Sequence, residues 1–105
     1  MLFLLCVLNL EKFEDLKPIH QYQLSQSCFV YLRTVENAFA QHRQGLLDDE
    51  LWLSLRQGLY ANFATIEHFG AVFQSSRRVF STDFAKIVEE EQMRFESKRK
   101  DQGGT

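Results

Sequence analysis

The side chains that carry most enzyme chemistry are few in this chain, and their spacing does not bring them together. The three histidines, at positions 20, 42 and 68, belong to no His-Glu-x-x-His or Glu-x-x-His pair, the spacings that place two metal ligands on one helix face. The chain also lacks glycine-rich phosphate loops and the Gly-x-Ser-x-Gly turn of serine hydrolases. We therefore predict no catalytic residue, no metal and no cofactor, and a protein that is not an enzyme.

The strongest candidate for a site is a polar cluster made of Arg33, Glu36, Asn37 and His42. These residues share a predicted helix whose aromatic stripe must be covered by other parts of the fold. A carboxylate in such a place needs a cation or an amide as its partner, because an unpaired buried charge costs several kcal/mol. Two interpretations of Glu36 follow: an ion pair or hydrogen bond between helices that fixes their packing, which we favour, and a carboxylate that grips a ligand.

The two cysteines, Cys6 and Cys28, form neither a disulfide framework nor a Cys-x-x-Cys site. No His or Lys is predicted beside Cys28 on its helix face, so a nucleophilic role has no support. Buried, inert thiols are typical of a reducing compartment, and no basic region or cleavage site of a signal peptide precedes them. The sequence thus favours the cytoplasm.

The first ten residues are almost unbroken apolar sequence. As a helix they would extend about 15 Å, against a hydrocarbon core of about 30 Å, so they are too short to span a bilayer. A short helix that is apolar on every side is covered by the rest of the fold, by a second copy, or by a segment absent from this chain. We predict an interaction surface here, formed by Leu2, Phe3, Leu5 and Leu8.

Composition bounds the size of the fold and the class of partner. The 105 residues, 45% of them hydrophobic and 13% aromatic, suffice for one packed domain without disulfides or metals. Twelve basic residues against fourteen acidic ones give a net charge of −2. Such a balance supplies no global positive field, so nucleic acid is not expected as a partner.

Proline, glycine and capping residues mark the ends of the predicted elements. Pro18 fits the first turn of a helix, and Gly45 fits the left-handed position after a helix. Asp48, Thr65 and Ser81 are predicted N-caps, and between these positions apolar residues recur every three or four residues. The predicted helices cover residues 18–44, 48–64, 66–76 and 82–97, after an N-terminal helical segment over 1–16 and before a disordered tail over 98–105.

The predicted class is therefore all-α, a bundle of four main helices plus a short N-terminal apolar helical segment, with one domain over residues 1–97. No stretch alternates between polar and apolar residues in the way that strands require. On the second helix the apolar face is predicted to contain Leu51, Trp52, Leu55, Leu59 and Phe63. Gly58 indicates a close approach of another helix.

Residues 32–52 contain Glu-Asn, Gln-His, Gly-Leu-Leu-Asp and Trp at fixed spacings. The pattern continues through Phe73 to Phe80-Ser81-Thr82-Asp83-Phe84. This pattern resembles a large group of uncharacterised bacterial proteins that have a membrane-anchoring helix near the N-terminus followed by a small helical domain. The resemblance implies the all-helical architecture, a place at the inner face of the membrane, and attachment only through a segment absent from this chain. It implies no catalytic residue.

The expected function is a non-enzymatic helical interaction module that binds protein or its own copy, as a homo-oligomer, through the N-terminal apolar surface. The alternative is a small-molecule or lipid-binding bundle, in which the phenylalanine-rich interior leaves a cavity between helices.

Overall fold

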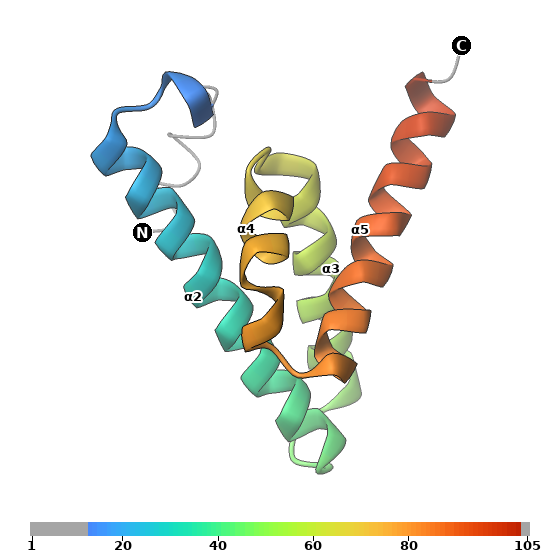
Figure 1. The fold of residues 1–105 in the computed structure, drawn as a ribbon. Coiled ribbons are helices and arrows are strands. Elements are labelled where there is room, and N and C mark those ends of the chain that lie inside the picture. The colour runs from blue at the N-terminus through green and yellow to red at the C-terminus, as the bar shows by residue number, and fades with distance from the viewer. Residues whose placement is uncertain (1–12, 104–105) are drawn as a thin grey trace.

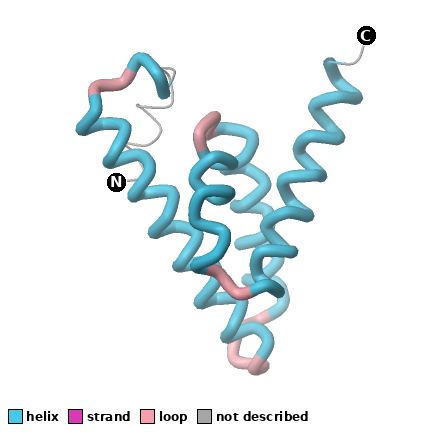
Figure 2. Tube along the Cα trace, viewed as in Figure 1, coloured by secondary structure: helices cyan, strands magenta, loops and turns pink. Residues whose placement is uncertain are grey.

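A computed structural model describes residues 13–103, and all regular structure in this range is helical (Figure 1). Four α-helices follow a 3₁₀ turn at Phe13–Asp15: α2 (Pro18–Arg43), α3 (Asp49–Thr65), α4 (Phe69–Ser76) and α5 (Thr82–Gly103), with a second 3₁₀ turn, Arg77–Val79, before α5. Short loops join them (Figure 2). The all-α class and the four main helices are confirmed, whereas most of the predicted N-terminal helical segment lies outside the described residues.

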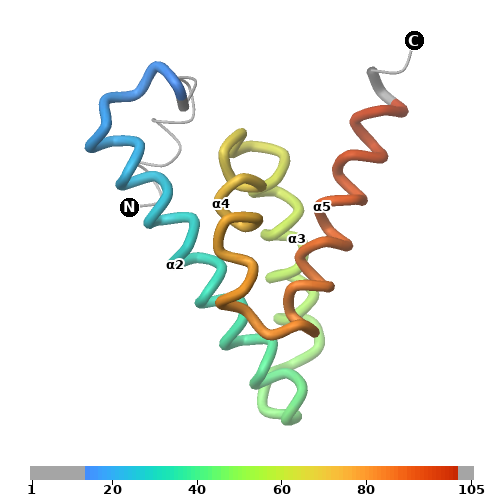
Figure 3. The backbone as a smooth tube through the Cα atoms, in the orientation of Figure 1, coloured from blue at the N-terminus to red at the C-terminus, as the bar shows by residue number. Residues whose placement is uncertain are grey.

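The helices form a V whose two arms are α2 and α5, with α3 and α4 between them (Figure 3). α3 packs mainly against α5, and α4 packs mainly against α2. The turn between α2 and α3 forms the apex of the V, and the end of α5 lies at its open side. The dimensions of the molecule, 43 × 38 × 26 Å, match this flattened outline.

α2 begins and ends as its sequence predicts. Pro18 occupies the first turn, where a helix loses nothing by the missing N–H group. At the other end Gly45 has a φ of 77°, and its N–H donates to the carbonyl of His42 while the N–H of Leu46 donates to the carbonyl of Gln41. This pair of bonds is the Schellman motif, which satisfies carbonyls that the helix leaves open.

The predicted start of the third helix is wrong. Thr65 is the last residue of α3 and not an N-cap, because its hydroxyl donates to the carbonyl of Ala61. Ile66 is buried, and its N–H donates to the carbonyl of Asn62, so the chain needs a further turn before α4 begins at Phe69. Burial of Ile66 therefore outweighs the capping preference of threonine.

The two remaining predicted caps differ from each other. Ser81 caps α5, because its Oγ accepts a hydrogen bond from the N–H of Phe84 at 3.2 Å. Asp48 occupies the N-cap position of α3, but its side chain makes no capping hydrogen bond. Its contribution is therefore that of a negative charge near the positive end of the helix.

α5 is longer than predicted, since it continues to Gly103 where a disordered tail was expected from residue 98. The ammonium group of Lys98 lies 5.8 Å from the centre of the Tyr60 ring, and the guanidinium of Arg99 lies 5.9 Å from that of Phe95. Long charged side chains thus cover aromatic surface while their heads stay in water, and this contact supports another turn of helix.

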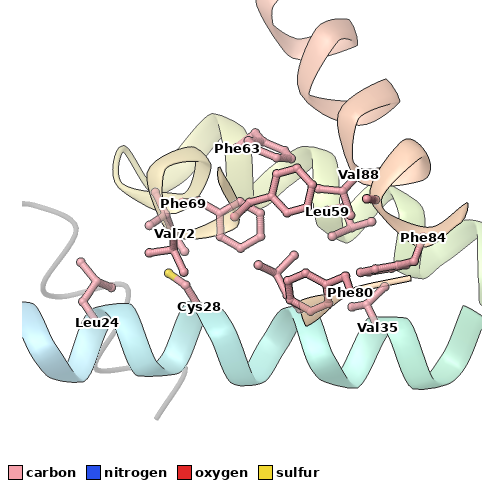
Figure 4. Close-up of a cluster of buried hydrophobic side chains, with 14 of the residues drawn as sticks. Leu24, Cys28, Val35, Leu59, Phe63, Phe69, Val72, Phe80, Phe84 and Val88 are labelled. Atoms are coloured by element: carbon pink, nitrogen blue, oxygen red, sulfur yellow. The ribbon is translucent and has the colours of Figure 1, made fainter. Parts of the chain in front are cut away.

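The core is a layer of aromatic and aliphatic side chains enclosed by all four helices (Figure 4). It fills the inside of the V and excludes water from the facing stripes of α2 and α5. Of the predicted apolar face on α3, Trp52, Leu59 and Phe63 are buried and Leu55 is partly buried, but Leu51 is half exposed. The fully buried members are Cys28, Leu32, Val35, Leu59, Phe69, Phe73, Phe84 and Val88.

Gly58 marks the predicted close approach of two helices. A Cβ atom at this position would lie 2.7 Å from Oη of Tyr31, so a larger residue would force the tyrosine hydroxyl of α2 to shift. The hydroxyl of Tyr31 also bonds to the side chain of Asn62 on α3, while burial raises the pKa of this phenol. One tyrosine therefore fixes how α2 and α3 cross.

Candidate functional site

An open groove of about 960 Å³ runs along the outer face of α2 and reaches the start of α5. Two phenylalanines, Phe29 and Phe39, contribute apolar surface, and Arg33 and Arg43 lie ten residues apart along the helix. The groove lies outside the phenylalanine-rich core. The alternative function, a small-molecule or lipid-binding bundle, was expected to have its cavity in the interior, between the helices. The remaining lining residues are Val30, Thr34, Glu36, Asn37, Ala40, Gln44 and Ser81.

Glu36 joins α2 to the first residues of α5. Its Oε2 accepts a hydrogen bond from the backbone N–H of Ser81 at 2.8 Å, and its Oε1 accepts one from Nη1 of Arg33 at 3.2 Å. The carboxylate thus lies at the positive end of α5 with a cation one turn away on its own helix. This geometry is the bond between elements that we favoured for Glu36, and both carboxylate oxygens are used.

Arg43 makes a second link between the same two elements. Its Nη1 lies 2.7 Å from Oδ2 of Asp83, and its guanidinium lies 5.5 Å from the centre of the Phe39 ring. The side chains of Arg33 and Arg43 remain 51% and 57% exposed. Each guanidinium is therefore held by one carboxylate and still presents donors to the groove.

The structure divides the predicted polar cluster. Asn37 lines the groove beside Arg33 and Glu36, but His42 lies on another side of α2. Nε2 of His42 is 2.8 Å from Oδ1 of Asp49, and its ring stacks on that of Trp52 with 5.5 Å between centres. His42 therefore joins α2 to α3 and takes no part in the groove.

Sequence reasoning missed a buried carboxylate at the contact of α3 and α5. The side chain of Glu91 is 3% exposed, and its Oε2 accepts a hydrogen bond from Nε of Arg56 at 2.9 Å and forms an ion pair with Nη2 of Arg56 at 2.6 Å. Its Oε1 is buried and has no hydrogen-bond partner, although Nη1 of Arg94 lies 3.4 Å away. Nothing in the run of three glutamates at 89–91 indicates which of them is buried, and the pairing across 35 residues leaves no local signal.

Cys28 is buried, and burial raises the pKa of its thiol from 9.0 to about 11. A thiol with so high a pKa is protonated at neutral pH and is a poor nucleophile. Burial also lowers the pKa of the His68 imidazole at the start of α4. Neither group lines the groove.

The other predicted surface, formed by Leu2, Phe3, Leu5 and Leu8, lies outside the described residues, as does Cys6. Within residues 13–103, no three His, Cys, Asp or Glu side chains come together as a metal site would require. In the same range no helix combines the length and the apolar run needed to cross a bilayer. No protein-family model, curated protein or solved structure matches the chain.

Proposed function

We propose that the chain is a non-enzymatic helical interaction module that pairs with a second copy through its N-terminal apolar residues. The observation that supports this is apolar exposure just downstream of those residues. Ile19 and Tyr22, in the first turns of α2, are 58% and 62% exposed. They lie one turn apart on one helix face, so an uncovered apolar surface stands at the start of α2, after the apolar residues 1–10 and the charged segment 11–17.

The proposal places the domain in the cytoplasm, where Cys6 and Cys28 stay reduced. In keeping with the bacterial group that the sequence resembles, longer relatives would hold this domain at the inner face of a membrane.

Sedimentation velocity of the full chain over a range of concentrations tests the pairing. In 500 mM salt we expect a dimer at tens of micromolar, and a monomer when Leu2, Phe3, Leu5 and Leu8 are all replaced by serine. The control carries Leu53→Ser and Val79→Ser, which remove exposed apolar side chains elsewhere on the surface. This control should still dimerise. A wild-type chain that is monomeric throughout and binds no hydrophobic dye would contradict the proposal.

The groove favours a second candidate function, the binding of a small amphipathic anion or lipid. Phe29 and Phe39 offer an apolar surface for a chain or ring, and Arg33 and Arg43 offer donors for a carboxylate or phosphate. This candidate rests on an open groove and no longer on an interior cavity.

Native mass spectrometry of gently purified protein tests the second candidate, with added dodecanoate as the probe. Saturable binding that falls at least tenfold in Arg33→Gln/Arg43→Gln would support it. Arg78→Gln, an exposed arginine outside the groove, is the control and should bind as wild type does. Equal binding by all three proteins, or none, would overturn this candidate.

A further inference from the structure

The outer half of α5 presents a basic and aromatic face. The guanidinium of Arg94 lies 4.5 Å from the centre of the Tyr60 ring, and the ammonium of Lys98 lies 5.8 Å from it. Tyr60 in turn packs edge-on against Phe95, with 6.2 Å between ring centres. We call this surface the basic arm: Tyr60, Arg94, Phe95, Lys98, Arg99 and Lys100. Glu96 and Asp101 are exposed on the same stretch of α5, so four basic side chains there outnumber two acidic ones.

The chain carries a surface of opposite charge at the turn between α2 and α3. Asp48, Asp49 and Glu50 are exposed there, and Asp49 keeps 96% of its side chain exposed although it bonds to His42. Two leucines flank these carboxylates, Leu46 with 72% and Leu51 with 50% exposure. We call this surface the acidic turn, defined by residues 46 and 48–51.

The two surfaces lie at opposite ends of the molecule. The acidic turn is the apex of the V, and the basic arm projects at its open side, beside the C-terminus (Figure 1). In a molecule 43 Å long, charges so placed are separated by more than the screening length of about 8 Å at physiological ionic strength. They therefore do not neutralise each other within one chain.

We infer that the basic arm binds the acidic turn of a second copy, so that chains associate head to tail. The match is one of charge, because carboxylates on the acidic turn meet ammonium and guanidinium groups on the basic arm. A contact between two different surfaces leaves one of each unused at the ends of every pair, so it extends into longer assemblies.

This inference rests on the proposed self-association and adds a second contact to it. Pairing through the N-terminal apolar residues alone stops at a dimer, whereas the head-to-tail contact allows growth beyond a dimer. The size limit of the assembly therefore distinguishes the two contacts.

The test is sedimentation velocity of the full chain over a concentration series in 20 mM and 500 mM salt. We expect wild type to grow beyond a dimer in low salt and to stop at a dimer in high salt, because surface charges are screened. Asp48→Lys/Glu50→Lys and Lys98→Glu/Lys100→Glu should each stop at a dimer. An equimolar mixture of these two variants should regain growth, since every contact between unlike copies again joins opposite charges.

The matched control is Lys17→Glu/Lys86→Glu, which makes the same charge change outside the basic arm and should grow as wild type does. Thermal melts of all variants check that each remains folded. Growth of the two charge variants alone, or a mixture that fails to grow, overturns the head-to-tail contact and leaves the N-terminal pairing intact. A wild-type chain that never exceeds a monomer overturns both proposals.

Discussion

At the scale of single residues, two carboxylates each join two helices, and they differ in how exposed they are to solvent. Glu36 is partly exposed and bonds to the backbone of Ser81 and to Arg33. Glu91 is enclosed and depends on Arg56. The cost of removing each carboxylate should therefore differ.

Replacing Glu36 by alanine should lower the free energy of unfolding by about 1–2 kcal/mol, the range for a charge-assisted hydrogen bond that is partly solvated. Urea unfolding measures this. Asn37→Ala changes the adjacent, exposed residue of the same helix and should shift stability by less than about 0.5 kcal/mol. Equal effects of the two substitutions would contradict a stabilising contribution of the bond between Glu36 and the N–H of Ser81.

Glu91→Ala should be more costly, about 3 kcal/mol, because it leaves the guanidinium of Arg56 in a partly buried place without its strongest partner. Glu90 also contacts Arg56, at 3.0 Å, but its side chain is 62% exposed. Glu90→Ala should therefore cost less than about 1 kcal/mol. Chemical denaturation of both variants gives the comparison, and a Glu91→Ala protein as stable as Glu90→Ala would contradict it.

Alkaline pH should weaken the fold through Cys28. Its pKa in the folded chain, about 11, lies above the value of 9.0 for a free thiol, so the unfolded chain loses this proton first. The stabilisation is complete below pH 9 and is lost as the pH rises toward 11. Burial raises the pKa of Tyr31 and acts in the same direction.

Urea unfolding at pH 8 and pH 10.5 measures this loss. Cys28→Ala should be less stable than wild type at pH 8, because it leaves a cavity, but its stability should decline less between the two pH values. An identical decline in both proteins would show that Cys28 does not contribute.

At the scale of elements, the contact of Tyr31 with Gly58 decides how α2 lies on α3. Gly58→Ala should destabilise the protein by about 1 kcal/mol or more, although alanine favours a helix, because its Cβ would lie 2.7 Å from Oη of Tyr31. In a Tyr31→Phe background, which lacks that oxygen, the same change should be neutral or stabilising. A double-mutant cycle measures the coupling. An unchanged cost of Gly58→Ala in that background would contradict the predicted clash.

Most elements could be predicted from local signals, because a helix begins and ends on a few neighbouring residues. Pro18, Gly45 and Ser81 each act within one turn of their own position, and all three were identified from sequence. The start of α4 and the end of α5 depend instead on tertiary contacts, the burial of Ile66 and the stacking of Lys98 on Tyr60. These contacts leave no mark in the local sequence.

The candidate site follows the same division. Arg33, Glu36 and Asn37 line the same groove, because neighbours on one helix stay together in any fold. The partner of Glu36 is a backbone amide 45 residues away, and the partner of Glu91 is an arginine 35 residues away. Spacing along the chain cannot predict such pairs.

At the scale of the whole molecule, the V shape leaves the outer part of α5 with fewer neighbours than its base. Phe84 and Val88 are fully buried, whereas residues 96–101 are exposed on every face. Amide hydrogen exchange should therefore be slowest around 84–88 and much faster beyond residue 96. Mass spectrometry of peptides from α5 measures this gradient. Within α5, the head-to-tail contact of the assembled state should slow hydrogen exchange only in the outer part, beyond residue 96.

The bond from Glu36 to the main-chain N–H of Ser81 leaves an uneven freedom to mutate. Every amino acid except proline supplies that N–H, so position 81 can lose its capping hydroxyl and keep this attachment. Position 36 has no such latitude, because only a side-chain acceptor of the right length reaches the amide. Among variants of this chain, substitutions should therefore be tolerated at position 81 and should be selected against at position 36.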